Sequence, residues 1–421
     1  MKTTAVRIYG KKDLRLESFE LPPIKDDEIL AKVVSDSLCM SSYKAAMQGT
    51  DHKRIPDDVA ENPTILGHEF SGEIIEVGQK WKDKFKPGDR FSIQPAHNKN
   101  DSQDAPGYSY PYCGGDATYV IIPPEIMEMD CLIKFDSDVF FPGSLAEPMS
   151  CIVGTYHAMY HTKQGSYVHI MGIKKGGNMA ILAGAGPMGL GAIDYAINNP
   201  DINPSLLVVT DVDEARLKRA SELFTSEDAA RKGIKLIYLN TRDINAVESL
   251  MALTGGKGYD DVFVMAPVRP VIEQGDAILT KDGCLNFFAG PADPNFKAEF
   301  NFYNVHYSYT HIVGTSGGNI DDMRESLDLM SKGLLNPTTM VTHIGGLDSA
   351  IEATLNLPKI PGGKKLIYTQ ISLELTAIDD FAKKGETDPL FAELARLVAK
   401  TNNLWNAEAE KYLLANAKPI A

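Results

Sequence analysis

The sequence has few cysteines, five in 421 residues, and they are scattered along the chain. That is too few for a disulfide framework, so we expect any cysteine with a special task to be a metal ligand or a core residue. The N-terminal MKTTAVRIYGKK has no apolar segment before its charges, which gives no sign of secretion and predicts a cytoplasmic protein. Basic residues are outnumbered, 42 against 56 acidic ones, and the net charge of −14 argues against nucleic acid as a partner.

A long, purely apolar run is also missing. Residues 179–197 come nearest, but they contain several glycines, a proline and Asp194, and a carboxylate inside a bilayer is costly. A buried strand that passes through a glycine turn into a helix explains these residues better, so we expect no membrane span. Hydrophobic residues make up 43% and charged residues 23%, the balance of a globular protein, and the length predicts two or three domains.

The pattern of residues changes twice along the chain. Residues 1–150 contain short β-branched runs between turn sequences and predict a β-rich domain, with 94–116 as a polar surface excursion. Apolar strand candidates then alternate with amphipathic stretches, which predicts an α/β fold with a doubly wound parallel sheet. These candidates are Met179–Ala183, Leu206–Thr210, Lys235–Tyr238, Asp261–Met265 and Cys284–Phe288. Residues 375–421 have a helical pattern.

Residues 184–189, GAGPMG, match the pattern G-x-G-x-x-G and lie between an apolar strand and a helix-like run. Gly184 allows the tight turn, Gly186 lets a pyrophosphate approach the backbone, and Gly189 permits close packing of helix on strand. With Pro187 and Met188 they place the phosphates at a helix N-terminus. The segment therefore predicts a dinucleotide-binding turn.

Asp211 stands at the end of the next strand. A carboxylate there accepts hydrogen bonds from the adenosine ribose and repels a 2′-phosphate, which predicts NAD as the cofactor. NADP is the alternative, and Arg216 in the following helix would then bind its phosphate. A second alternative is a turn that only packs the helix, with Asp211 capping the helix that begins at Asp213.

Cys39, His68 and Glu147 are candidate ligands of a metal ion. His68 lies in the dense string GHEFSG, and Glu147 lies in LAEP. A thiolate, an imidazole and a carboxylate form a three-ligand set for zinc that leaves one coordination position open, as in a catalytic site. Singly, the cysteine and the histidine are also explained as core residues, and the glutamate as a charge at a helix N-terminus. Their joint occurrence with a dinucleotide fold favours the zinc site.

The chain resembles the zinc-dependent medium-chain dehydrogenase/reductase family, the alcohol and polyol dehydrogenases, over about residues 1–370. The motifs that carry the resemblance are the His68-Glu69 string, Lys86-Pro87-Gly88-Asp89-Arg90, Gly114-Gly115, Glu147-Pro148, the glycine turn and Gly314-Thr315-Ser316-Gly317-Gly318. The resemblance implies a GroES-like catalytic domain over 1–150 and a Rossmann domain over 151–313. Residues 314–421 would return to the catalytic domain and add a helical C-terminal extension.

The resemblance also implies ligands for one catalytic zinc per chain. Cys39, His68 and Glu147 would hold it as in the polyol branch of the family, and Glu69 would lie beside the metal or exchange into its coordination shell. A structural zinc needs four closely spaced cysteines, whereas region 94–116 contains only Cys113. We therefore expect no structural zinc.

Ser41 and Lys44, which follow Cys39 in the sequence, are candidates for moving the proton of a substrate hydroxyl. Ser41 is placed to take or give this proton, and Lys44, one helical turn further, would pass it through the nicotinamide ribose to solvent. Many family members have a histidine at the position of Lys44. The alternatives are a helix N-cap for Ser41 and a solvated surface charge for Lys44.

Within the polyol branch, the Cys39–Lys44 run and the long tail are most similar to the L-sorbose 1-phosphate reductases, which interconvert a ketose phosphate and a hexitol phosphate. A phosphorylated substrate needs local positive charge, for which the candidates are Lys53, Arg54, Lys174 and Lys175. One alternative is a dehydrogenase of an unphosphorylated hexitol or butanediol. The other is a non-catalytic dinucleotide-binding protein. A homodimer or homotetramer is expected.

Overall fold

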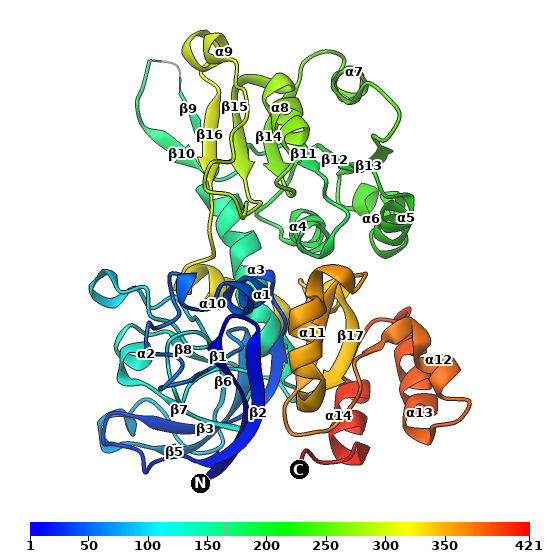
Figure 1. Ribbon diagram of the computed structural model, residues 1–421. Coiled ribbons are helices and arrows are strands. Elements are labelled where there is room, and N and C mark those ends of the chain that lie inside the picture. Colours follow the sequence, from blue (N-terminus) through cyan, green and yellow to red (C-terminus); the bar gives the residue numbers. More distant parts are fainter. Residues whose placement is uncertain (164) are drawn as a thin grey trace. The chain divides into compact units, whose positions relative to one another are not determined.

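The computed structural model describes residues 1–163 and 165–421 and consists of two compact units (Figure 1). The first unit contains Met1–Glu147 and Val341–Ala421, and the second contains Pro148–Met340. Among the described residues, no helix combines the length and the apolar character that crossing a membrane requires.

The first unit is built on a mostly antiparallel sheet in the order β19-β17-β18-β3-β5-β6-β8, with β7 also paired to β3. A smaller sheet has the order β2-β1-β4. Their bounds are β1 (Lys2–Gly10), β2 (Asp13–Glu20), β3 (Ile29–Ser37), β4 (Thr64–Ile65), β5 (Phe70–Val77), β6 (Arg90–Ile93), β7 (Tyr119–Ile122), β8 (Leu132–Lys134), β17 (Val341–Gly346), β18 (Lys364–Tyr368) and β19 (Thr376–Ala377). Because β18 pairs with β3, with Leu366 opposite Ser37, a late segment of the chain lies beside the residues that lead to Cys39.

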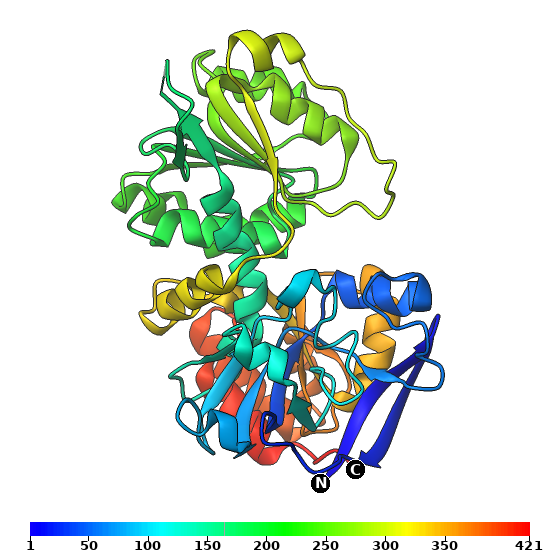
Figure 2. The ribbon, with the colours of Figure 1, turned by 90° about the vertical axis from the view of Figure 1, so that its left-hand side faces the viewer.

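The helices of the first unit include a group from the C-terminal extension. They are α1 (Met40–Gln48), α2 (Pro124–Glu128), α11 (Ala350–Asn356), α12 (Phe381–Lys384), α13 (Pro389–Val398) and α14 (Ala407–Asn416), and α3 (Phe141–Ala158) begins here and continues into the second unit. The extension is helical as predicted. Its last residues return to the first strand, where the Thr4 hydroxyl donates to the Ala421 carbonyl at 3.4 Å, so both termini lie at one end of this unit (Figure 2).

The second unit contains the predicted doubly wound sheet, with parallel strands in the order β13-β12-β11-β14-β15-β16. A hairpin of β9 (Tyr160–Thr162) and β10 (His169–Met171) precedes it. The strands are β11 (Asn178–Leu182), β12 (Leu206–Asp211), β13 (Lys235–Asn240), β14 (Tyr259–Val264), β15 (Leu279–Phe287) and β16 (His311–Gly314). The helices are α4 (Pro187–Asn198), α5 (Glu214–Leu223), α6 (Ser226–Arg231), α7 (Ala246–Leu253), α8 (Arg269–Ala277), α9 (Phe302–Tyr307) and α10 (Ile320–Ser331).

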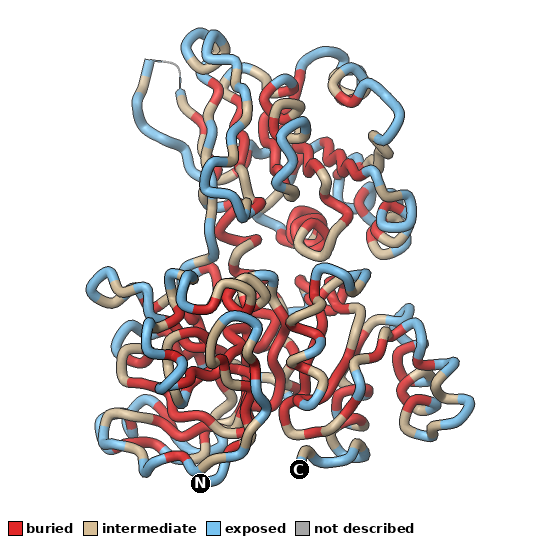
Figure 3. Tube along the Cα trace, in the orientation of Figure 1, coloured by how far each residue is buried: buried red, intermediate tan, exposed pale blue. Residues whose placement is uncertain are grey.

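Both faces of this sheet are covered, which explains the nearly continuous apolar strands in the sequence. Every residue of β12 is buried (Figure 3). Leu207 and Val209 belong to one hydrophobic cluster, whereas Leu206 and Val208 belong to another. Successive side chains of a strand point to opposite faces, so the two clusters lie on opposite faces of the sheet.

The chain returns to the first unit later than the sequence analysis placed it. The prediction put the return at residue 314, but residues up to Met340 belong to the second unit. The reason is the apolar face of α10 and the segment after it. Leu329, Leu335 and Met340 pack in the same cluster as Ile181 and other core residues of the parallel sheet.

The predicted surface excursion at 94–116 is wrong for much of its length. Ala105 and Tyr108 are buried, and so are Cys113 and Asp116. The backbone of Gly115 donates to the Gly67 carbonyl at 2.6 Å, and the backbone of Asp116 donates to the Leu66 carbonyl. Polar residues and prolines made this loop look exposed, yet it lines the segment that contains His68.

The environment of His157, in the second unit, indicates that the stability of the fold depends on pH. His157 Nδ1 lies 2.7 Å from Asp322 Oδ1, and its Nε2 lies 3.3 Å from Glu325 Oε2. Hydrogen bonds to these two carboxylates raise the pKa of His157 from 6.5 to about 10. A raised histidine pKa stabilises the fold fully below the unfolded value, and this stabilisation is lost as the pH rises toward and through 10.

We therefore expect the unfolding temperature to fall between pH 6.5 and 10 by more in the unmodified protein than in His157→Gln. Calorimetry over this range measures the difference. His306→Gln is the control, because His306 is an exposed histidine of the same unit. Parallel curves for His157→Gln and the unmodified protein would show that the charge of His157 contributes nothing.

Candidate functional site

The residues that lead to the candidate metal centre adopt specific backbone conformations. Cys39 follows β3 and occupies the N-cap position of α1, where the helix dipole favours a thiolate. The N-cap is therefore not Ser41, the alternative considered from the sequence. On the facing segment, Gly67 has φ +88°, and a Cβ there would lie 2.6 Å from the backbone nitrogen of Asp116. Glycine is needed at this turn, which directs His68 toward Cys39.

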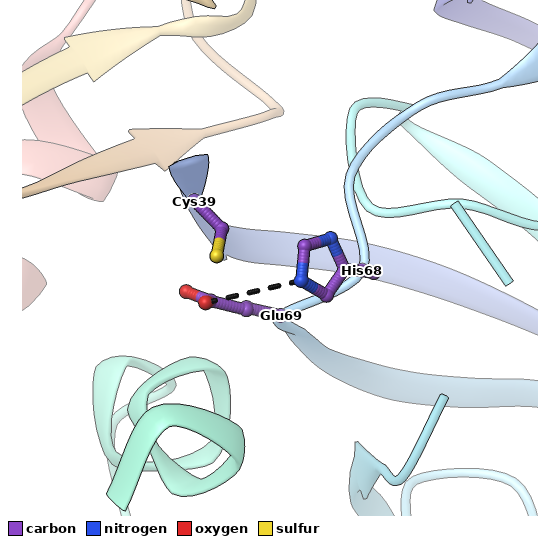
Figure 4. A group of neighbouring side chains, drawn as sticks. All are labelled: Cys39, His68 and Glu69. Atoms are coloured by element: carbon purple, nitrogen blue, oxygen red, sulfur yellow. Dashed lines mark ion pairs between the residues drawn. The ribbon is translucent and has the colours of Figure 1, made fainter. Parts of the chain in front are cut away.

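Figure 4 shows Cys39, His68 and Glu69 directed toward one another from these two segments. One ligand atom from each lies within 4.8 Å of the other two, and the His68 Nε2 to Glu69 Oε1 distance is 4.0 Å. On the other side of the imidazole, the hydroxyls of Ser42 and Tyr108 lie 3.1 and 3.0 Å from Nδ1. These partners orient the ring so that Nε2 faces the thiol and the carboxylate.

The donor set fits a divalent zinc ion. Burial lowers the pKa of His68 to about 4, so the imidazole is neutral and has a lone pair for a metal. The pKa of the Cys39 thiol is raised to about 12. Burial is the main cause, and the carboxylates of Glu69 and Glu147 add to it. A thiol in this environment ionises near neutral pH when a cation compensates its charge, as ligation to zinc does.

Glu69 lies beside Cys39 and His68, and it has further partners that the sequence did not reveal. Both of its carboxylate oxygens lie 2.5 Å from Lys364 Nζ, and the Ser37 hydroxyl donates to it. Although burial opposes ionisation, the Lys364 ammonium lowers the pKa of Glu69, and the carboxylate in turn raises the pKa of the lysine. The pair is charged and buried beside the centre.

Lys364 is a site residue that sequence reasoning missed. It stands on β18, almost 300 positions after Glu69, and nothing in its neighbourhood signals the pairing of β18 with β3. Glu147 lies half-buried on α3, and its charge acts on both Cys39 and Lys364. The closely spaced donor atoms thus belong to Cys39, His68 and Glu69, whereas the sequence analysis expects Glu147 as the third ligand.

The predicted proton-transfer residues lie on α1. The Ser41 hydroxyl donates to Cys39 Sγ at 3.0 Å and lies 3.2 Å from His68 Nε2. A hydrogen bond also joins it to the Tyr108 hydroxyl. Lys44 is half-buried, one turn further along the helix. Ser41 is therefore placed among the donor atoms, with Tyr108 as a second hydroxyl that the sequence did not reveal.

Positive charge gathers beside this centre. Burial, followed by the charges of Arg54, Lys53 and Lys44, lowers the pKa of His52 to about 4. The Arg54 guanidinium lies 5.6 Å from the centre of the Tyr108 ring, on which His52 stacks, and its charge also reaches His68. Within residues 1–163 and 165–421, no acidic side chain forms an ion pair with Arg54.

Lys174 and Lys175, the other predicted phosphate-binding residues, have a different environment. Lys174 Nζ lies 2.6 Å from Asp260 Oδ1, and its backbone N–H donates to Asp261 at 2.9 Å. Both lysines precede β11, at the end of the sheet opposite the glycine turn. Lys174 is exposed and paired with Asp260, which argues against the predicted role, and Lys175 is exposed as well.

The glycine turn has the geometry expected for a dinucleotide. A Cβ on Gly189 would lie 2.0 Å from the Gly184 carbonyl oxygen, so close packing requires glycine there. A Cβ on Gly186 would meet nothing within 4 Å, which leaves open space next to the backbone. Gly186 is the N-cap of α4, and Pro187 is its first residue, so free N–H groups of the helix border that space.

Asp211 is tied to this turn and does not cap α5. Its carboxylate accepts hydrogen bonds from the N–H groups of Ala185, Val212 and Asp213 at 2.8–3.2 Å. The N-cap of α5 is Asp213, which also lies 3.9 Å from Arg216 Nε. Arg242, missed from the sequence, follows β13, and its Nε donates to the Val212 carbonyl at 3.0 Å.

We expect Asp211→Ser to weaken NAD binding and to reduce the preference for NAD over NADP. The substitution would remove a negative charge from the place where we expect a 2′-phosphate to lie. Dissociation constants for both cofactors, measured by fluorescence, test this expectation. Asp213→Ser is the control, since it keeps Asp211 and removes a neighbouring negative charge, while serine can still cap α5. A higher kcat/KM of the unmodified protein with NADP(H) than with NAD(H) would contradict the assignment and point to Arg216 or Arg242.

Comparison with known proteins places these observations in a family. Residues 25–129 match the family described as alcohol dehydrogenase GroES-like domain, and residues 187–332 match the zinc-binding dehydrogenase family. Among solved structures, 2R,3R-butanediol dehydrogenase from Bacillus subtilis superposes with a TM-score of 0.68 at 23% identity, covering 87% of this chain and 99% of that one. The fold is thus that of a medium-chain dehydrogenase.

Two curated relatives match almost the whole chain. Mannitol-1-phosphate 5-dehydrogenase from Aliivibrio fischeri is 55% identical over 414 residues, 98% of this chain and 97% of that protein. L-sorbose 1-phosphate reductase from Klebsiella pneumoniae is 52% identical over 418 residues, 99% of this chain and 98% of that protein. The resemblance seen in the motifs therefore extends through the C-terminal extension.

Proposed function

Because the chain belongs to the zinc-dependent alcohol and polyol dehydrogenase family, and is an oxidoreductase of that type, we propose that it acts on a hexitol phosphate and the corresponding ketose phosphate. The proposed pair is D-glucitol 6-phosphate and L-sorbose 1-phosphate, with NAD as the hydride acceptor. The names of the two relatives support phosphorylated substrates of this class.

The proposed metal site is one catalytic zinc per chain, with Cys39, His68 and Glu147 as ligands. Zinc would supply Lewis-acid chemistry at the reacting hydroxyl. Ser42 and Tyr108 orient His68, and Lys364 keeps Glu69 ionised next to the ligands. The Ser41 hydroxyl would accept the substrate proton, and Lys44 on the same helix would help to transfer it to solvent.

The observation that carries the phosphate assignment is the position of Arg54. This guanidinium packs against Tyr108, whose hydroxyl contacts His68, and no carboxylate of the described chain pairs with it. Lys53 and Lys44 add positive charge around the same histidine, His52. Charged donors bind phosphate strongly, so Arg54 would hold an anion on the side of Tyr108, whose hydroxyl contacts His68.

The proposal is tested by comparing D-glucitol 6-phosphate, which is also called sorbitol 6-phosphate, with sorbitol. Each is measured with NAD on the unmodified enzyme. We expect kcat/KM to be about ten- to hundredfold higher for the phosphate, the value of one charge-assisted contact kept in the transition state. Equal efficiency on both would instead indicate a dehydrogenase of unphosphorylated polyols. The absence of turnover with any hexitol or hexitol phosphate would contradict the proposed substrate class.

A further inference from the structure

The first two turns of α3, Phe141–Glu147, are held less firmly by their own helix than its later turns. Pro148 follows Glu147 directly, inside the helix. Since proline has no N–H, the carbonyl of Ser144 receives no helical hydrogen bond from that position, and the ring crowds the same carbonyl. Contacts from outside the helix therefore matter more for the position of the turns that contain Glu147.

A carboxylate from the C-terminal extension lies at the start of this helix. Glu410, on α14, is 1% exposed and accepts hydrogen bonds from the backbone N–H groups of Phe140 and Phe141, the latter at 2.9 Å. The Tyr368 hydroxyl donates to the same carboxylate at 2.7 Å and accepts from Trp405 Nε1 at 2.7 Å. Amides at a helix start have no acceptor within the helix, and the helix dipole favours an anion there.

Apolar contacts join the same turns to the extension. Phe141 and Leu145, four residues apart and so on one face of α3, belong to a single hydrophobic cluster with the extension. Its members from the extension include Phe381, Phe391, Leu394, Trp405 and Leu413. Toward the sheet, the Ser144 hydroxyl lies 2.7 Å from that of Ser35, and the Ser92 hydroxyl donates to the Gly143 carbonyl at 2.6 Å. The sheet and the extension thus hold the two turns from different sides.

We propose that the C-terminal extension positions the metal-binding carboxylate of Glu147, with Glu410 as the positioning residue that fixes the start of α3. The inference rests on the proposed function in one respect, the assignment of Glu147 as a ligand. A buried carboxylate is costly unless its hydrogen bonds are made, and here they are made to the helix that contains Glu147.

The test uses the zinc-loaded full-length protein and measures the rate at which zinc passes to a chromogenic chelator. Glu410→Gln keeps the shape of the side chain but removes its charge and one of its acceptor oxygens. We expect about tenfold faster zinc loss, at the lower end of what removing a supporting hydrogen bond costs a metal site. The matched control is Glu408→Gln on the same helix, an exposed carboxylate paired with Lys400, which should leave zinc loss unchanged.

A double-substitution comparison separates positioning from a general loss of stability. If Glu410 acts through Glu147, Glu410→Gln will not accelerate zinc loss further in a Glu147→Ala background. Equal acceleration in both backgrounds, or none in Glu410→Gln alone, overturns the proposal. If Glu147→Ala by itself leaves zinc loss unchanged, the ligand assignment of the proposed function fails as well. Should Glu410→Gln not fold, Tyr368→Phe, which removes the hydroxyl that donates to Glu410, gives the same comparison with a smaller expected effect.

Discussion

Cys39→Ser is expected to abolish dehydrogenase activity and to lower the zinc content while the protein remains folded. As a thiolate, Cys39 would be the softest donor of the proposed site, and its loss would leave His68 with carboxylates alone. A Lewis acid contributes several kcal/mol of transition-state stabilisation, so activity should fall by roughly a thousandfold or more. Metal analysis and kcat/KM on the same preparation measure both effects.

The control is Cys131→Ser, a buried cysteine of the first unit outside the candidate centre. It should keep zinc and activity, with at most a lower unfolding temperature. Cys39→Ser protein with full zinc content and near-normal turnover would show that the thiol is not a ligand. Two tightly bound zinc ions per chain in the unmodified protein would contradict the single-site assignment.

Arg54→Ala is expected to lower kcat/KM for sorbitol 6-phosphate by about ten- to hundredfold and to leave that for sorbitol nearly unchanged. A hydrogen bond between a guanidinium and a phosphate is worth about 1.5–3 kcal/mol. Arg54 lies over the ring of Tyr108, whose hydroxyl contacts His68. Steady-state kinetics on both substrates with NAD give the two ratios.

Lys174→Ala serves as the comparison, since that lysine is paired with Asp260 and lies beyond the amino end of β11. It should affect stability and leave the substrate preference intact, whereas Lys53→Ala should have a smaller effect than Arg54→Ala. A preference that survives Arg54→Ala but disappears in Lys174→Ala would reverse the assignment.

The sequence predicted the parallel sheet well because its signals are local. The buried strands of the second unit appear as apolar runs, and β12 was expected at Leu206–Thr210 and found at Leu206–Asp211. The glycine turn and Asp211 are likewise close in sequence, and their spacing together with the flanking strand and helix patterns indicates them. What spacing cannot show is a partner far along the chain, and Lys364 is the clearest case, because its pairing with Glu69 depends on β18 lying beside β3.

Other misses have the same physical origin. Region 94–116 contains the polar residues and prolines of a surface loop, yet Tyr108 is buried against His68, because the hydroxyl finds its hydrogen-bond partner there. Lys174 is a candidate phosphate-binding residue in the sequence, but the structure places Asp260 beside it. The charge of a residue can be read from the sequence, whereas its compensation is a property of the fold.

The most direct test of the account is dehydrogenase activity measured while zinc is added back to metal-free protein. With hexitol phosphate and NAD at saturation, activity should rise from near zero in proportion to the zinc bound. It should level off at one zinc per chain, when the proposed centre of Cys39, His68 and Glu147 would be filled. Full activity in the metal-free protein, or a plateau reached only at two zinc ions per chain, would contradict the account.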